Sequence, residues 1–222
     1  GTLEQIADNG NGHYGYIDSY DEAKRTFGKH LSGSLLTIAK DVKIQVEFNP
    51  ANVSAYRLIG YENRLLADED FNDDTKDAGE IGAGHTVTAF YELMPAGAAG
   101  WRPGVDPLKY QPVETPAPEG VLDHELFTVK VRYKEPEGHN SRLLTRTVAN
   151  EYTSLSESSP DFQFASAVAL FGLRLRGSHY AQHVGYQDIV QLAKAGLNVR
   201  DVEERVEFLQ LVTQVDGMRG GR

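Results

Sequence analysis

Residues 41–48 alternate polar and apolar side chains without interruption, which is the pattern of a β-strand with one covered face. The apolar positions are Val42, Ile44, Val46 and Phe48. The polar positions between them are Asp41, Lys43, Gln45 and Glu47. We expect the apolar set to face a core and the polar set to face water.

A reversal is predicted directly after this strand. Residues 49–52 have the sequence Asn-Pro-Ala-Asn, in which proline fixes φ and asparagine tolerates turn geometry. We therefore expect the chain to return along residues 53–60 and to form a β-hairpin with the first strand. A further strand is predicted within residues 85–93.

The second clean alternation lies in residues 127–134, where Phe127, Val129, Val131 and Tyr133 share one face. Residues 135–140 contain Pro, Gly and Asn, so they predict a turn, and residues 142–148 predict the returning strand. Together these stretches indicate an antiparallel β-sandwich that spans residues 40–150.

After Thr153 the spacing of apolar residues changes from two to about 3.6, which indicates helices. Ser159 followed by Pro160 is a well-formed helix start, and Gly177 is expected to end that helix. A second helix is predicted near residues 186–195, and a third after the capping residue Asn198. The predicted fold class is α+β, with the sandwich packed against a helical group of residues 151–222.

The N-terminal residues 1–39 have a different organisation. A short helix is expected at residues 3–9, a strand at 13–17, and a second helix opened by the capping box Ser19-x-x-Glu22. One strand between two helices has no partner for its hydrogen-bonding edges, so we expect it to come from a larger sheet upstream. We predict that this strand either lies on the sandwich or pairs with another copy of the chain.

The charge of the chain restricts its partners. Among 222 residues, 32 are acidic and 22 basic, and the net charge of −10 argues against nucleic acid or anionic lipid. No apolar run approaches the roughly 20 residues of a membrane-spanning helix. The absence of cysteine removes disulfides and thiolate sites. The opening residues Gly-Thr-Leu-Glu have no signal-peptide character, and we expect a fragment of a longer protein.

An acidic loop at residues 66–84 is the strongest candidate for a binding site. Its run Asp68-x-Asp70-x-Asn72 is similar to the first half of a calcium loop, but Asp73 and Gly79 replace the glycine and glutamate that the second half requires. The candidate metal ligands are Asp68, Asp70, Asn72, Asp74 and Glu80. The alternative is a solvated acidic loop whose side chains, Asp73 and Asp77 among them, contact a basic protein partner.

Two other motifs give weaker indications. Residues 10–15 match G-x-G-x-x-G, but the motif leaves a helix and enters a strand, which is the reverse of a dinucleotide-binding loop. His179 and His183 have the spacing of zinc ligands on a helix, yet Tyr180 stands where a catalytic zinc site has glutamate. Surface histidines are the alternative.

No catalytic residue is indicated, because the chain has no G-x-S-x-G elbow and no cysteine. A hydrolase is retained only as a remote alternative. Trp101 and Tyr110 lie in the Pro-rich stretch 95–120, where they form either an interaction platform or an anchor that holds the long loop to the sandwich. The anchor is the simpler interpretation.

Long runs of the chain resemble a known bacterial family. LEQIADNGNGHYGYIDSYDEAKRTF is similar to the last helix, edge strand and helix of a von Willebrand factor A domain. Residues 35–93, with RYKEPEGHNSRLL, FQFASAVALFGLRLRGSHY and VEFLQLV, resemble the C-terminal region of bacterial von Willebrand A proteins of the YfbK type, a domain of unknown function.

The resemblance implies an envelope-associated or secreted protein. It also implies that a divalent cation would be held upstream, because the Asp-x-Ser-x-Ser run of von Willebrand A domains does not occur in these residues. We therefore expect no cofactor in this chain. The leading hypothesis is a non-enzymatic scaffold that supports the von Willebrand A domain and contacts unknown protein partners, and a calcium-binding module is the alternative.

Overall fold

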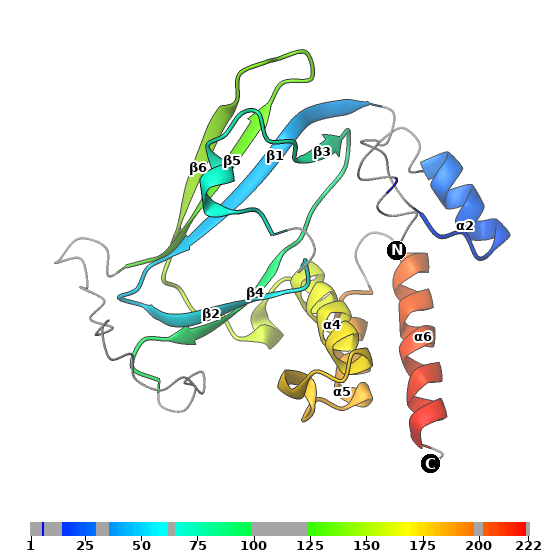
Figure 1. Ribbon diagram of the computed structural model, residues 1–222. Helices are drawn as coiled ribbons and strands as arrows, with labels where there is room; N and C mark the ends of the chain where they lie inside the picture. The colour runs from blue at the N-terminus through cyan, green and yellow to red at the C-terminus, as the bar shows by residue number, and fades with distance from the viewer. Residues whose placement is uncertain are drawn as a thin grey trace. The chain divides into compact units, whose positions relative to one another are not determined.

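The computed structural model describes residues 6, 15–29, 36–61, 65–98, 124–197 and 202–220. The chain divides into two compact units, residues 1–150 and 151–222. Both contain regular structure of the predicted types, so the α+β class is confirmed (Figure 1).

Two antiparallel sheets make up the body of the first unit (Figure 1). The larger sheet has the order β3-β1-β5-β6, with strands β1 Thr37–Phe48, β3 Gly79–Gly82, β5 Glu125–Lys134 and β6 Arg142–Ala149. The smaller sheet pairs β2 Val53–Ile59 with β4 Phe90–Pro95. A 3-10 helix, η3, spans Asp68–Phe71.

The predicted hairpin of β1 and β2 is wrong, although the reversal is present. Both edges of β1 are taken by β3 and β5, so β2 pairs with β4 in the other sheet. At the turn, Val53 N donates to Asn49 O at 2.9 Å. The side-chain amides of Asn49 and Asn52 both donate to Glu125 O, at 2.7 and 2.9 Å. These bonds tie the turn to β5 and carry the chain from one sheet to the next.

Aromatic rings connect the two sheets. The Phe48 ring at the end of β1 lies 4.5 Å from Tyr56 of β2 and 5.2 Å from Tyr91 of β4, measured between ring centroids. It also lies 5.7 Å from Phe127 of β5. Such tilted and edge-on contacts add to the burial of apolar area. The apolar face of β1 is therefore covered at its Phe48 end.

The face prediction for β1 is wrong at the centre of the strand. Lys43, expected to face water, is 4% exposed, whereas Ile44, expected to face a core, is 52% exposed. From Lys43 to Phe48 the alternation of side chains is as predicted, and a β-bulge interrupts it at Asp41. The difference arises because the acidic loop lies over the polar face near Lys43, while the smaller sheet covers only the Phe48 end of the apolar face.

The second predicted hairpin is confirmed. β5 and β6 pair in regular register from Phe127↔Val148 to Tyr133↔Arg142, and Gly138 N closes the turn by donating to Glu135 O at 2.8 Å. Strand β3 falls inside the stretch predicted as an acidic loop. It has only four residues and two glycines, so its sequence carries no strand pattern.

The N-terminal helix begins where predicted. Ser19 Oγ accepts from Glu22 N at 3.1 Å and caps helix α2, Tyr20–Lys24, which continues as a π-helical turn η1, Arg25–Lys29. The strand predicted at residues 13–17 is not formed by residues 15–17, where the structure has no regular element, and residues 13 and 14 lie outside the described part. A strand without a neighbour has no hydrogen-bonding partner to stabilise it.

The described residues of the second unit form three α-helices, α4 Pro160–Leu175, α5 Tyr186–Ala195 and α6 Val202–Gly220, with short 3-10 turns η4 Leu155–Glu157 and η5 His179–Ala181. Ser159 Oγ accepts from Phe162 N at 3.2 Å, as the predicted start requires, and Gly177 follows the helix with φ +68°. The hydrophobic core of the second unit consists of Ala167, Phe171, Tyr186, Ile189, Val190, Ala193 and Val212. No helix in the described part of the chain is long and apolar enough to cross a membrane.

Candidate functional site

The acidic loop between β2 and β3 is held down by a lysine from the strand beneath it. Lys43 Nζ donates to the main-chain oxygens of Asp70, at 3.0 Å, and Asp73. The first oxygen belongs to η3 and the second to the turn that follows. A buried ammonium needs several acceptors, and here carbonyl groups of the loop supply them.

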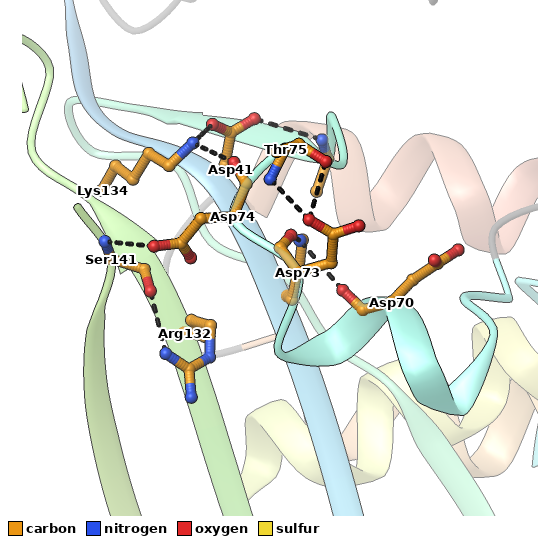
Figure 2. A network of polar contacts seen from close by, with 10 residues as sticks. Asp41, Asp70, Asp73, Asp74, Thr75, Arg132, Lys134 and Ser141 are labelled. Carbon is orange, nitrogen blue, oxygen red and sulfur yellow. Dashed lines mark hydrogen bonds and ion pairs between the residues drawn. The ribbon is translucent and has the colours of Figure 1, made fainter. Parts of the chain in front are cut away.

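A second lysine binds the other end of the loop. Lys134 Nζ, at the end of β5, donates to Asp41 Oδ2 at 2.6 Å and to Asp74 O at 2.7 Å (Figure 2). Asp41 stands at a β-bulge, with φ +51° and one extra residue in β1 between the pairs Lys40↔Lys134 and Lys43↔Arg132. Bulges redirect a side chain, and this one presents the carboxylate to Lys134.

The electrostatics of this ion pair favour both charges. Burial raises the pKa of the Asp41 carboxyl, but the hydrogen bond and charge of Lys134, with the Ala78 N–H, outweigh burial and lower the pKa below its usual value. The hydrogen bond to Asp41 raises the pKa of Lys134. Each partner therefore keeps the other ionised.

Arg132 of β5 fixes the middle of the loop. Its Nη2 donates to Asn72 Oδ1 at 2.9 Å and its Nη1 to Ser141 Oγ at 2.8 Å. The guanidinium also lies 5.5 Å from the centre of the Phe71 ring, which is 5% exposed. Ser141 N in turn donates to Asp74 Oδ2 at 3.2 Å, and its hydrogen bonds lower the pKa of Asp74 (Figure 2).

The remaining carboxylates of the loop have local partners. Asp73 Oδ1 accepts from Thr75 N at 2.8 Å and from Thr75 Oγ1 at 2.7 Å, and these bonds lower its pKa (Figure 2). Asp70 Oδ2 lies 3.2 Å from Lys76 Nζ. Asp77, the other predicted partner contact, has an exposed side chain.

The calcium ligands predicted from the sequence do not converge on one point. Asn72 and Asp74 bind Arg132 and Ser141, Asp70 pairs with Lys76, Asp68 is exposed at the start of η3, and Glu80 lies in β3. Among the described residues, no three acidic or histidine side chains are arranged to hold a metal ion. The positively charged groups that contact the acidic loop are those of Lys43, Arg132 and Lys134. A calcium site at this loop stays a prediction. Lysines on an apparently solvated strand face gave no signal of this role in the sequence.

The described residues bear on only one of the other motifs, the histidine pair. His179 lies in the 3-10 turn η5, which ends at Ala181, and His183 lies beyond that turn, so the two histidines do not share a face of one α-helix. Residues 10–14 of the glycine motif, Trp101 and Tyr110 lie outside the described residues.

These features can be compared with known proteins. Residues 33–218 match the family described as the C-terminal part of the uncharacterized protein YfbK. The chain belongs to this YfbK C-terminal family. It is 39% identical over 216 residues to the uncharacterized protein YfbK of Escherichia coli K12, and the alignment covers 97% of the chain and 36% of that protein. The chain thus spans about a third of that relative's length. No solved structure matches the chain.

An apolar row on the larger sheet is the other conspicuous surface of this YfbK family domain. Ile44, Val131 and Leu144 stand opposite one another on β1, β5 and β6. Ile44 is 52% and Leu144 57% exposed. The alternation of β1 and β5 is visible in the sequence. The open row is not, because it depends on what the rest of the unit leaves uncovered.

An open groove of about 450 Å³ lies between helices α5 and α6. Its apolar floor is formed by Val190, Val206 and Leu209, and Lys194 is the one titratable residue among its lining side chains.

Proposed function

We propose that this YfbK family domain is a non-enzymatic interaction module that supports a von Willebrand A domain preceding it in a longer bacterial envelope protein. The observation that carries the proposal is the exposure of large apolar side chains in the segment before the family region. In residues 15–29, Tyr20 is 83%, Tyr16 74% and Phe27 63% exposed.

The position of this segment supports a contact with a preceding domain. The family match begins at residue 33, so the segment lies before it, whereas the alignment to the longer E. coli relative covers nearly the whole chain. A short helix with exposed aromatic side chains gains stability when a neighbouring domain buries them, at about 25 cal/mol per Å² of apolar surface. The resemblance of the segment to the end of a von Willebrand A domain is the reason for proposing such a domain as the neighbour, and the proposed envelope location rests on the same resemblance.

The polar cluster around the acidic loop supports a structural role for that region. Its charged groups are bonded to one another through Lys43, Arg132 and Lys134, which leaves them little capacity to change partners during a reaction. Such a bonded cluster fits a module that binds other proteins.

The test uses the full-length protein and the variants Tyr20→Asp and Phe27→Asp. We expect the intact protein to show one coupled thermal transition for the preceding domain and the YfbK family domain, and each variant to separate it into two. Tyr152→Asp, at a side chain that is 93% exposed in the second unit, is the matched control and should leave the transition unchanged. Independent unfolding of the two parts in the unsubstituted protein would refute the proposal. Cell fractionation tests the envelope location.

A further inference from the structure

We propose that β6 is a docking edge to which an extended acidic segment of a partner protein adds as a fifth strand of the larger sheet. This proposal rests on the proposed function in treating the domain as an interaction module, and it names a surface and a class of partner. Strand addition of this kind gains affinity from main-chain hydrogen bonds and specificity from alternate side chains.

The direction of the backbone groups in β6 follows from the ladder. Asn49 N donates to Leu126 O at 2.9 Å, so this pair is hydrogen-bonded between β1 and β5 and the next pair, Phe48↔Phe127, is not. Residues of an antiparallel strand alternate in the side to which their N–H and C=O point. Phe127 therefore directs its backbone groups to β6, where it pairs with Val148.

Continuing this alternation assigns every residue of the regular part of β6. Arg142, Leu144, Arg146 and Val148 are the partners that bond to β5. Leu143, Thr145 and Thr147 consequently point their N–H and C=O groups away from β5. Since β6 is the last strand of the sheet, no strand among the described residues pairs with these groups. They form three evenly spaced donor and acceptor pairs along an open edge.

The β6 edge lacks three of the features that usually protect an edge strand, which are proline, a bulge and short length. It has eight residues with no proline or glycine, and its register with β5 is regular from Val148 to Arg142. The opposite edge, β3, has four residues and two register irregularities, which blunt it. Leu143 and Leu144 expose 47% and 57% of their surfaces on the two faces of β6. A long, regular edge of this kind is a template for another strand.

Charge selects the class of partner. Arg142 and Arg146 stand on either side of Leu144 on the same face of β6, so this edge is locally basic. Arg142 makes an exposed ion pair with Glu135, 2.9 Å from Nη1 to Oε1, and Arg146 has no carboxylate partner among the described residues. A strand with carboxylates opposite both arginines and an apolar residue opposite Leu144 would complement this edge and extend the row from Ile44.

A second copy of the chain fits the edge less well. Antiparallel pairing of β6 with itself through Leu143, Thr145 and Thr147 places residues of even number opposite one another. Arg142 and Arg146 of both copies would then share one face without a carboxylate between them, and like charges on one face destabilise a strand pair. An acidic segment is therefore the favoured occupant.

The test uses the isolated chain and a blocked heptapeptide probe of sequence Val-Thr-Glu-Thr-Val-Thr-Glu. In antiparallel register its glutamates stand opposite Arg146 and Arg142 and its second valine opposite Leu144. We expect binding to slow hydrogen exchange at the amides of Leu143, Thr145 and Thr147, measured by NMR. A probe with lysine in place of glutamate should bind at least tenfold more weakly.

Three variants make the result specific to the edge. Thr145→Pro removes an outward N–H while leaving the bonds to β5, and it should abolish binding, whereas the matched control Thr145→Val should retain it. Arg146→Glu should reverse the preference between the two probes. Unchanged amide spectra of β1 and β5 will show that each variant is folded.

Equal affinity for the two probes, or protection confined to residues outside β6, would overturn the proposal. A dimer in sedimentation whose β6 amides are protected without probe would also overturn it, in favour of a second copy as occupant. The peptide experiment does not involve the preceding domain. Its result can therefore refute the docking edge while coupled unfolding of the full-length protein supports the proposed function, or support the docking edge while unfolding is uncoupled.

Discussion

Lys43 Nζ lies 3.0 Å from the main-chain oxygen of Asp70, and the lysine side chain is 4% exposed. Lys43 belongs to the face of β1 that the sequence predicts to be solvent-exposed. It instead anchors the acidic loop, which begins more than twenty residues later in the chain. The ammonium bonds to main-chain oxygens at two points of the loop, Asp70 and Asp73. This relationship makes the acidic loop part of the folded body of the first unit.

Replacing Lys43 by methionine should destabilise the first unit by about 1–3 kcal/mol, because the carbonyls of Asp70 and Asp73 lose their buried donor. We expect a lower denaturation midpoint and faster amide exchange in residues 70–76. Lys130→Met is the matched control. Lys130 makes an exposed ion pair with Glu47, worth at most about 1 kcal/mol. Equal losses for the two variants would contradict the anchoring role.

The contrast between Lys43 and Ser159 shows what the sequence could predict. Ser159, Pro160 and Gly177 act within one or two turns of the helix that they delimit, so their pattern is sufficient. The burial of Lys43 depends on a loop from elsewhere in the chain, and no local pattern records it. The same holds for the turn at Asn49, whose side chain donates to Glu125 and directs β2 into another sheet.

The proposed docking edge β6 was likewise predictable in its local features but not in its long-range ones. The turn signals in residues 135–140 predict the returning strand at residues 142–148, and β6 and its pairing with β5 are as predicted. That β6 is an open edge depends on the order of strands in the sheet, which places β3 and β1 on the other side of β5. Strand order is set by long-range pairing and was beyond a prediction from periodicity.

The stability of the first unit should depend on pH through Asp41 and its neighbours. The pKa values of Asp41, Asp73 and Asp74 lie below the ordinary value of 3.8, so their contribution is present above that value and is lost as the pH falls through the lower values. The pKa of Lys134 lies above 10.5, so its contribution is lost as the pH rises beyond that range. Thermal melts should therefore show a plateau between about pH 4 and 10.

Asp41→Asn provides the check on this assignment. Removing the carboxylate should lower the plateau and flatten both limbs of the pH profile, because Lys134 loses its partner at the same time. Asp161→Asn, in the second unit, should leave the profile of the first unit unchanged. If the melting temperature of Asp41→Asn falls as steeply at acidic and alkaline pH as that of the unsubstituted protein, other groups control the pH dependence.

Addition of calcium should not stabilise the first unit. A ligand that binds the folded state raises its melting temperature. In the acidic loop, however, Lys43 and Lys134 already occupy the carbonyl oxygens of Asp70, Asp73 and Asp74. We expect the same melting temperature in millimolar calcium, in magnesium and with a chelator. A saturable rise with calcium that Asp70→Asn abolishes would restore the calcium site as an explanation of the loop.

The second unit should be sensitive to a single added methyl group at Gly196, which ends α5. A Cβ there would lie 2.6 Å from Phe164 Cβ, 2.9 Å from Arg205 Nη1 and 2.9 Å from Pro160 O. Arg205 Nη1 also donates to Gly196 O at 2.7 Å, so the side chain has little freedom to withdraw. Overpacking of this kind costs about 1–3 kcal/mol, and Gly196→Ala should lower the midpoint of helix unfolding accordingly.

Gly217→Ala is the matched control for this prediction, because a Cβ at Gly217 in α6 meets no atom within 4 Å. Alanine is the better helix former, so this variant should be neutral or more stable by up to about 1 kcal/mol. The φ of Gly196 is −91°, which alanine adopts freely, so any loss in Gly196→Ala reports crowding alone. Equal stability of both variants in circular dichroism melts would contradict the claim that Gly196 packs closely against Phe164 and Arg205.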